Sequence, residues 1–170
     1  MTTSLLFAPF AHHIWATEQL IDACSGLTLE QLETPAPGTY GSIIGTLRHI
    51  VSSDGWYLTF FRKDGVVEVE EEADTGLADL RSAFSINGAA WMDVIAGDLD
   101  ADEDIVERGN GLEVLSPVGL RLAQVVHHGT DHRSQVCTAL TSLGIEPPEI
   151  DLWAWARATG RERAVGAPAT

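Results

Sequence analysis

Two histidines, His128 and His132, stand four residues apart in the segment VVHHGTDHRSQV, residues 125–136. In a helix this spacing places both side chains on one face, one turn apart. Two neutral imidazoles placed in this way can bind a single ion, and imidazole is a suitable ligand for zinc, iron, nickel and copper. The spacing alone is a weak signal, so its meaning depends on the residues around it.

The residues around the pair favour a metal site over a chance occurrence of this spacing. Gly129 lies between the histidines, where a helical glycine costs about 1 kcal/mol relative to alanine, which indicates close backbone packing or a crowded site. His49 lies within TLRHIVSSDGWYL, in the middle of another expected helix, and needs a polar partner if it is buried. Asp131, Arg133 and Gln135 can orient imidazole rings or brace neighbouring helices. The alternative, a polar core whose histidines are satisfied by neighbouring side chains, remains open at this point.

Apolar residues at helical spacing predict four long helices, over about residues 4–24, 41–61, 75–98 and 117–142. Ser42 and Thr75 are expected to cap the second and third helices, and Pro117 to open the fourth. The Gly-Asn-Gly centre of EDIVERGNGLEVLSP predicts a hairpin before the fourth helix, and EIDLWAWARATG predicts a short final one. The chain is therefore expected to be all-α, an antiparallel four-helix bundle in one domain, residues 1–170. Metal and ligand sites in such bundles are built from side chains on facing helices.

Two connecting segments are expected to be irregular. SGLTLEQLETPAPG, which leaves the first helix, contains two glycines and two prolines and is typical of a loop. VVEVEEEAD, which follows the second helix, is expected to be a solvated run of acidic residues.

Composition excludes several classes of protein. The 170 residues carry ten Lys and Arg against 25 Asp and Glu, a formal net charge of −15, which disfavours nucleic acid as a partner. No apolar run approaches the roughly 20 residues of a membrane-spanning helix, and the N-terminus lacks the basic region of a secretory signal. Cys24 and Cys137 are too few for a disulfide framework and are expected to be small buried side chains. We therefore expect a soluble cytoplasmic protein that binds neither nucleic acid nor a membrane.

LRHIVSSDGWYL, followed much later by VVHHGTDHRSQV, resembles the DinB-like superfamily of metalloenzymes, which includes bacterial thiol S-transferases. The likeness covers most of the chain: four long helices, a short insertion before the last of them, and a histidine on the second. The later segment is similar to the family's His-x-x-x-His-Arg-x-Gln stretch, here His128, His132, Arg133 and Gln135. The resemblance implies that three histidines hold a divalent metal and that solvent completes its shell. The ligands in this chain would be His49, His128 and His132.

Three protein ligands leave an open position, which is typical of a catalytic metal site. A water bound there is acidified towards a pKa of about 7, and a thiol bound there loses its proton. The resemblance implies the thiolate chemistry at least as strongly as the hydrolytic one. The co-substrate would then be a low-molecular-weight thiol. The expected function is thus a thiol S-transferase or hydrolase for a small electrophilic or toxic molecule, in detoxification, with zinc, nickel or iron as the metal.

A non-catalytic alternative is a helical binding or assembly module, in which any metal only fastens the second and fourth helices. The apolar stripes also permit a homodimer. Asp131 is the candidate for an acid or base held near the ligands, ahead of Asp54, although each is turned away from its neighbouring histidine around the helix.

Several further residues are candidates to line the site. His12 and His13 can reach it from the first helix, whereas His127 points about 100° away from its neighbour in the pair. Tyr40 and Tyr57 can supply hydroxyls, and Trp56, seven residues after the histidine of the second helix, can form a pocket wall.

Overall fold

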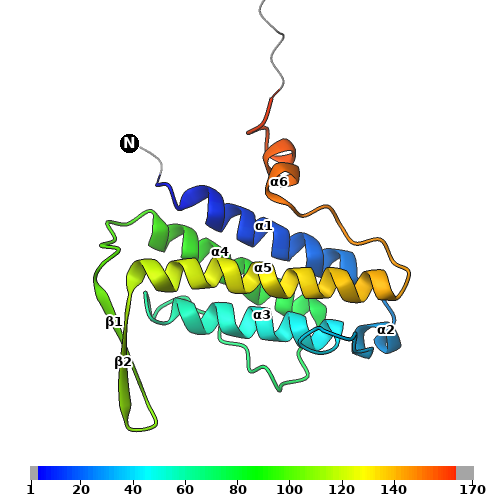
Figure 1. Ribbon diagram of the computed structural model, residues 1–170, viewed down its shortest axis with the longest axis horizontal. Helices are drawn as coiled ribbons and strands as arrows, with labels where there is room; N and C mark the ends of the chain where they lie inside the picture. The colour runs from blue at the N-terminus through cyan, green and yellow to red at the C-terminus, as the bar shows by residue number, and fades with distance from the viewer. Residues whose placement is uncertain (1–3, 164–170) are drawn as a thin grey trace, which may run out of the picture.

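The computed structural model describes residues 4–163, which are mostly helical with one small two-stranded sheet (Figure 1). The elements are α1 (Phe7–Cys24), α2 (Leu29–Glu33), α3 (Ile43–Leu58), α4 (Leu77–Ile95), β1 (Asp104–Gly109), β2 (Leu112–Pro117), α5 (Val118–Ser142) and α6 (Leu152–Ala158). The predictions of four long helices, a hairpin before the last of them and a short final helix are confirmed.

The four long helices lie side by side, with contacts between α1 and α4, α4 and α3, α3 and α5, and α5 and α1 (Figure 1). α1 and α5 run in one direction, and α3 and α4 run in the other. The pairs α1–α4 and α3–α5 are therefore antiparallel, as expected, but α3–α4 and α1–α5 are parallel. The cause is the long connection 59–76, which carries the chain back to the end at which α3 began. Only short connections force neighbouring helices to be antiparallel.

The ends of the helices follow local capping chemistry. Ser42 caps α3 as predicted, because its hydroxyl accepts a hydrogen bond from the N–H of Gly45 at 3.2 Å. Thr75 does not cap α4, and that prediction was wrong: Gly76 is the N-cap, and the N–H of Thr75 donates within the preceding turn to the carbonyl of Ala73. Pro117 immediately precedes α5, in agreement with its predicted role.

The segment expected to be a loop after α1 contains the short helix α2, so the prediction was wrong there. Thr28 and Gln31 form a capping box, in which each side chain accepts a hydrogen bond from the other's backbone N–H, at 3.2 and 2.9 Å. Leu32 is buried against the core, which explains why a five-residue helix is stable here.

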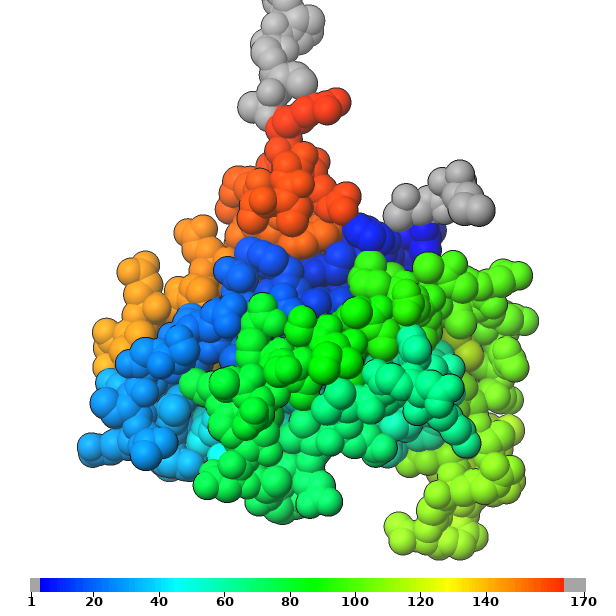
Figure 2. All heavy atoms as spheres, turned by 180° about the vertical axis from the view of Figure 1, so that it is seen from behind, coloured from blue at the N-terminus to red at the C-terminus, as the bar shows by residue number. Residues whose placement is uncertain are grey.

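The hairpin pairs β1 with β2 in antiparallel register, from Asp104 opposite Pro117 to Gly109 opposite Leu112. Asn110 and Gly111 form its turn with positive φ angles of 51° and 76°, a conformation that Asn-Gly adopts readily. The hairpin projects from one end of the helices, and seen from behind it stands away from the connection 59–76, with an open recess between them (Figures 1 and 2).

The interior contains two apolar clusters, one towards each end of the helices. The long helices contribute to both, represented by Leu20, Leu47, Phe84 and Leu140 in the first and by Phe10, Leu58, Trp91 and Leu122 in the second. Cys24 belongs to the first cluster and Cys137 is half-buried against it. Within residues 4–163, no helix has the length and apolar character needed to cross a membrane.

Candidate metal site

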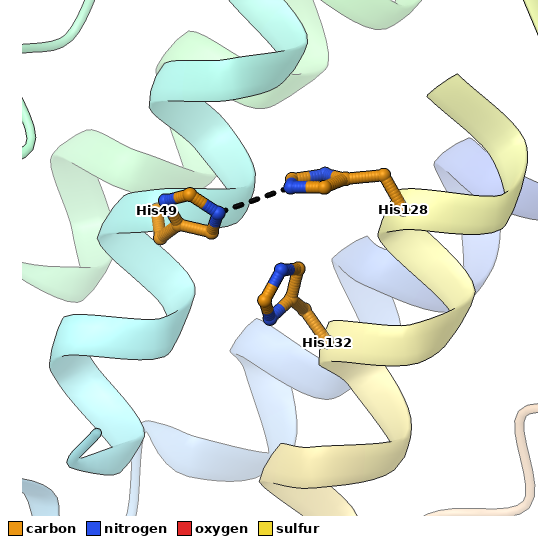
Figure 3. A group of neighbouring side chains, drawn as sticks. All are labelled: His49, His128 and His132. Carbon is orange, nitrogen blue, oxygen red and sulfur yellow. Dashed lines mark hydrogen bonds between the residues drawn. The ribbon is translucent and has the colours of Figure 1, made fainter. Parts of the chain in front are cut away.

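The structure brings together the three histidines that the sequence singled out. His49 comes from α3, and His128 and His132 come from α5; the three rings point towards one another between these antiparallel helices (Figure 3). One nitrogen of each ring lies within 4.8 Å of the others, and the Nε2 atoms of His49 and His128 are 3.0 Å apart. An ion bound at about 2.1 Å to two nitrogens requires them to be about 3.0–3.4 Å apart, so this pair already has a suitable separation.

Two of the rings are fixed through their outer nitrogens. The Nδ1 atom of His49 is 2.8 Å from a carboxylate oxygen of Glu71, and the Nδ1 atom of His132 is 3.1 Å from the amide oxygen of Gln135. The same amide oxygen accepts a hydrogen bond from the backbone N–H of Tyr40 at 2.8 Å. Because oxygen accepts in both cases, each Nδ1 carries the proton and each Nε2 keeps its lone pair for the centre of the cluster. This is the arrangement by which carboxylates and amides orient metal-binding histidines.

The surroundings of the two histidines of α5 favour the neutral form of their rings. Burial, together with the neighbouring His132 and His49, lowers the pKa of His128 to about 4. Burial also lowers the pKa of His132, and the nearby His49 adds to that effect. Imidazole must be deprotonated to bind a metal, so His128 and His132 fit a divalent cation at neutral pH without having to release protons.

Two aromatic rings form walls beside the histidines. The ring of Tyr40 stacks on His49 with 4.0 Å between centroids and meets the edge of His132 at 5.2 Å. Its hydroxyl donates to Glu71 at 2.5 Å. At the other end of the cluster, the ring of Tyr57 lies 5.9 Å from that of His128. Both tyrosines that the sequence proposed as lining residues therefore lie at the site.

Glu71 is the residue that the sequence missed. It belongs to the acidic run that was expected to be solvated, and for this residue the expectation was wrong, because Glu71 binds both His49 and Tyr40. The connection 59–76 passes back along α3 and places Glu71 there. Its type and its spacing give no local signal that distinguishes it from the neighbouring Glu70 and Glu72.

Asp131, the predicted acid or base, is exposed, and among the described residues no hydrogen bond joins it to the three histidines. It acts on them only through its charge, which tends to raise the pKa of His128 and His132. Its chemical role remains a prediction. His127 is exposed on another side of α5, and His12 lies elsewhere, with its Nε2 2.8 Å from the carbonyl oxygen of Ile150.

A second, fully buried polar cluster lies between the two apolar clusters. The guanidinium of Arg133 donates to Nδ1 of His13 at 2.9 Å and to the hydroxyl of Thr17 at 3.0 Å. Because a guanidinium only donates, Nδ1 of His13 must accept, so its Nε2 carries a proton and donates to Asp54 at 2.9 Å. The indole N–H of Trp91 donates to the other oxygen of Asp54 at 3.0 Å. His13 and Asp54 are therefore structural, and Arg133 braces the helices as predicted.

Gly129 joins the two clusters. A Cβ at this position would lie 2.3 Å from Cε1 of His13 and 2.9 Å from a guanidinium nitrogen of Arg133. The ring of His13 thus lies directly against the backbone of α5, between the turns that carry His128 and His132. Glycine is required for this approach, which confirms the close packing expected from the sequence.

Comparison with known proteins agrees with this architecture. A model of the DinB family matches residues 1–164 of the chain. A crystal structure of a DinB-like protein from Bacillus cereus ATCC 10987 has a similar fold, with a TM-score of 0.66 and 18% sequence identity over 87% of this chain and 98% of that one. No curated protein matches the chain. Since the family match extends over nearly the whole sequence, the chain belongs to the DinB family.

Proposed function

We propose that this protein is a divalent-metal-dependent enzyme, a thiol S-transferase or hydrolase that acts on a small electrophilic or toxic molecule in the cytoplasm. The observation that carries the proposal is the orientation of His49 and His132, whose outer nitrogens are held by Glu71 and Gln135 so that their lone pairs face a shared centre. Zinc, nickel and iron all accept such ligands.

The residues of the chain have separable tasks in this proposal. The three histidines hold the ion and leave part of its coordination shell for a small molecule. A divalent ion bound there would acidify a water or bind a low-molecular-weight thiol as its thiolate. Glu71 and Gln135 fix the tautomers of two ligands, and Tyr40 covers their rings on one side.

The rival function is a binding or assembly module in which the ion only fastens α3 to α5. Other interactions already hold these helices in place. Ile50 and Val136 belong to the same apolar cluster, and Asp54 and Arg133 are linked through His13. These interior contacts do not involve the three histidines, which supports a catalytic rather than a structural role for the metal.

Elemental analysis of the purified protein tests the proposal. We expect about one equivalent of a transition metal in the wild type and its loss in His128→Ala, because two imidazoles hold a divalent ion far less tightly than three. His127→Ala is the matched control, since it removes an exposed histidine from the adjacent position. Full metal content in His128→Ala, or none in the wild type after reconstitution with zinc, nickel and iron, would show that the site is not a metal site.

Chelation then separates the two functions. If the ion is catalytic, the metal-free protein should keep its helical circular dichroism and cooperative unfolding. If the ion is structural, chelation should unfold the protein or destabilise it severely.

A further inference from the structure

A pocket of about 330 Å³ lies where the hairpin meets α3 and α5. We infer that it binds the apolar part of an uncharged small-molecule substrate whose reactive group lies at the three histidines. This inference rests on the proposed metal-dependent function and adds a substrate class to it. The volume lies within the range of small-ligand sites and is large enough for one aromatic ring or branched alkyl group with its linker.

The pocket lies next to the histidine cluster. Tyr57 lines it, and the ring of Tyr57 is 5.9 Å from the ring of His128. Gln124, which also lines the pocket, precedes His128 by one turn of α5, a rise of about 6 Å. A molecule with its head at the histidines would therefore reach the pocket through a linker of about three methylene groups.

Part of the pocket wall is formed by large apolar side chains that are open to solvent. Trp56 is 42% exposed, Val114 53% and Leu120 62%, and the three come from α3, β2 and α5 respectively. Large apolar side chains gathered in a concave surface mark a binding site more often than scattered ones do. The prediction that Trp56 forms a pocket wall is in accord with this position.

The single cation of the pocket lining is already neutralised. Arg121 donates to Glu107 and to the hydroxyl of Ser116, both at 2.8 Å, and its guanidinium lies 4.0 Å above the ring of Phe60. Its side chain is buried by these contacts, so it is not available to pair with an anionic group of a ligand. With no unpaired cation in its lining and a net charge of −15 on the chain, the pocket selects against anions.

Binding of two hydroxamates to the zinc-reconstituted protein, followed by calorimetry, tests this assignment. Acetohydroxamate supplies only a metal-binding head, whereas the same head on a phenylpropyl chain also reaches the pocket. We expect the phenylpropyl compound to bind at least about tenfold more tightly, because its ring leaves water for an apolar wall. Leu120→Asp should abolish this advantage. Leu115→Asp is the matched control, because Leu115 is similarly exposed, at 57%, but does not line the pocket.

The outcomes distinguish this inference from the proposed function. If acetohydroxamate itself does not bind, the assignment of the metal site is wrong, and the assignment of the substrate pocket is overturned as well. If acetohydroxamate binds but the phenylpropyl chain adds nothing in the wild type, the metal site stands and the pocket assignment is overturned. Equal loss of the advantage in both variants would also overturn it. So would a dimeric wild type that becomes monomeric in Leu120→Asp, since a second copy of the chain would then cover the pocket.

Discussion

The molecule contains two polar clusters less than one helical turn apart along α5: the open cluster of three histidines and the buried cluster around His13. Their hydrogen bonds differ in kind. In the buried cluster both nitrogens of His13 are bound to fixed protein groups, Arg133 on one side and Asp54 on the other. In the open cluster the outer nitrogens of His49 and His132 are bound in the same way, but their inner nitrogens face only other imidazoles.

The difference separates a structural use of histidine from a ligand-binding one. Burial lowers the pKa of both His13 and His128, so a perturbed pKa does not distinguish the clusters. The distribution of hydrogen-bond partners does distinguish them. A ring with two permanent partners has no remaining lone pair for an ion, whereas rings with one partner each can converge on a cation.

Gly129→Ala should have the largest effect, because this residue lies between the clusters. A helical Gly→Ala change ordinarily stabilises by about 1 kcal/mol, but here the new methyl group would overlap the ring of His13. We expect a loss of about 3 kcal/mol in the free energy of unfolding of the metal-free protein, measured by urea denaturation. Gly26→Ala, where a Cβ would meet no atom within 4 Å, should change it by less than about 1 kcal/mol. A more stable Gly129→Ala variant would contradict the contact between α1 and α5.

Asp54→Asn should break the buried cluster alone. The substitution keeps the shape of the side chain but removes the carboxylate that accepts from both His13 and Trp91 and offsets the charge of Arg133. We expect a loss of about 2–3 kcal/mol in the free energy of unfolding, with metal stoichiometry unchanged. Asp131→Asn, at an exposed position, should leave stability within about 0.5 kcal/mol of the wild type. Loss of metal in Asp54→Asn without loss of stability would mean that the two clusters are not separable.

Some features of the fold can be predicted from the sequence and others cannot. Helix positions and the cap at Ser42 are local properties, encoded in apolar spacing and one hydroxyl, and they could be predicted. The five residues of α2 are too few for such spacing to be visible. The parallel contacts of α3 with α4 and of α1 with α5 depend on the path of the connection 59–76, which no local pattern specifies.

The same limit applies to the side chains. His128 and His132 share a helix face, so their proximity follows from helix geometry. The pairing of His49 with Glu71 does not follow from helix geometry, because only the path of the connection 59–76 brings Glu71 to His49. The pairing of His13 with Arg133 spans 120 residues, and its one local trace is Gly129.

Glu71→Gln should weaken the open cluster alone. Glutamine can still accept from His49, but it lacks the negative charge that increases the basicity of a ligating imidazole. We expect metal affinity to fall about 10- to 100-fold, measured by titration against a competing chelator, with the free energy of unfolding of the metal-free protein within about 1 kcal/mol of the wild type. Glu72→Gln, at the exposed neighbouring position, should keep wild-type affinity. If both variants behave alike, the effect is the general charge of the acidic run and not the bond to His49.

The smallest expected effect is the pH dependence of the metal-free protein. The pKa of His128 is lowered from 6.5 to about 4 by burial and by the neighbouring histidines. Below pH 6.5 the unfolded chain therefore binds a proton that the folded chain does not, and stability falls as the pH is lowered towards 4. The ring is only half-buried, so solvent screening should keep its contribution under about 1 kcal/mol per pH unit.

Thermal melts between about pH 7.5 and about pH 5 would measure this slope. His128→Gln should flatten it in the metal-free protein, because the variant has no imidazole to protonate at this position. The part of the slope that is due to His13, whose pKa is also lowered by burial, should remain in that variant. His13 belongs to the buried cluster, whose hydrogen bonds do not involve the metal site. Zinc should add stability to the wild type at neutral pH, and this gain should disappear on acidification as protons displace the ion. An unchanged slope in His128→Gln would show that acid acts through groups other than His128, such as His13 in the buried cluster.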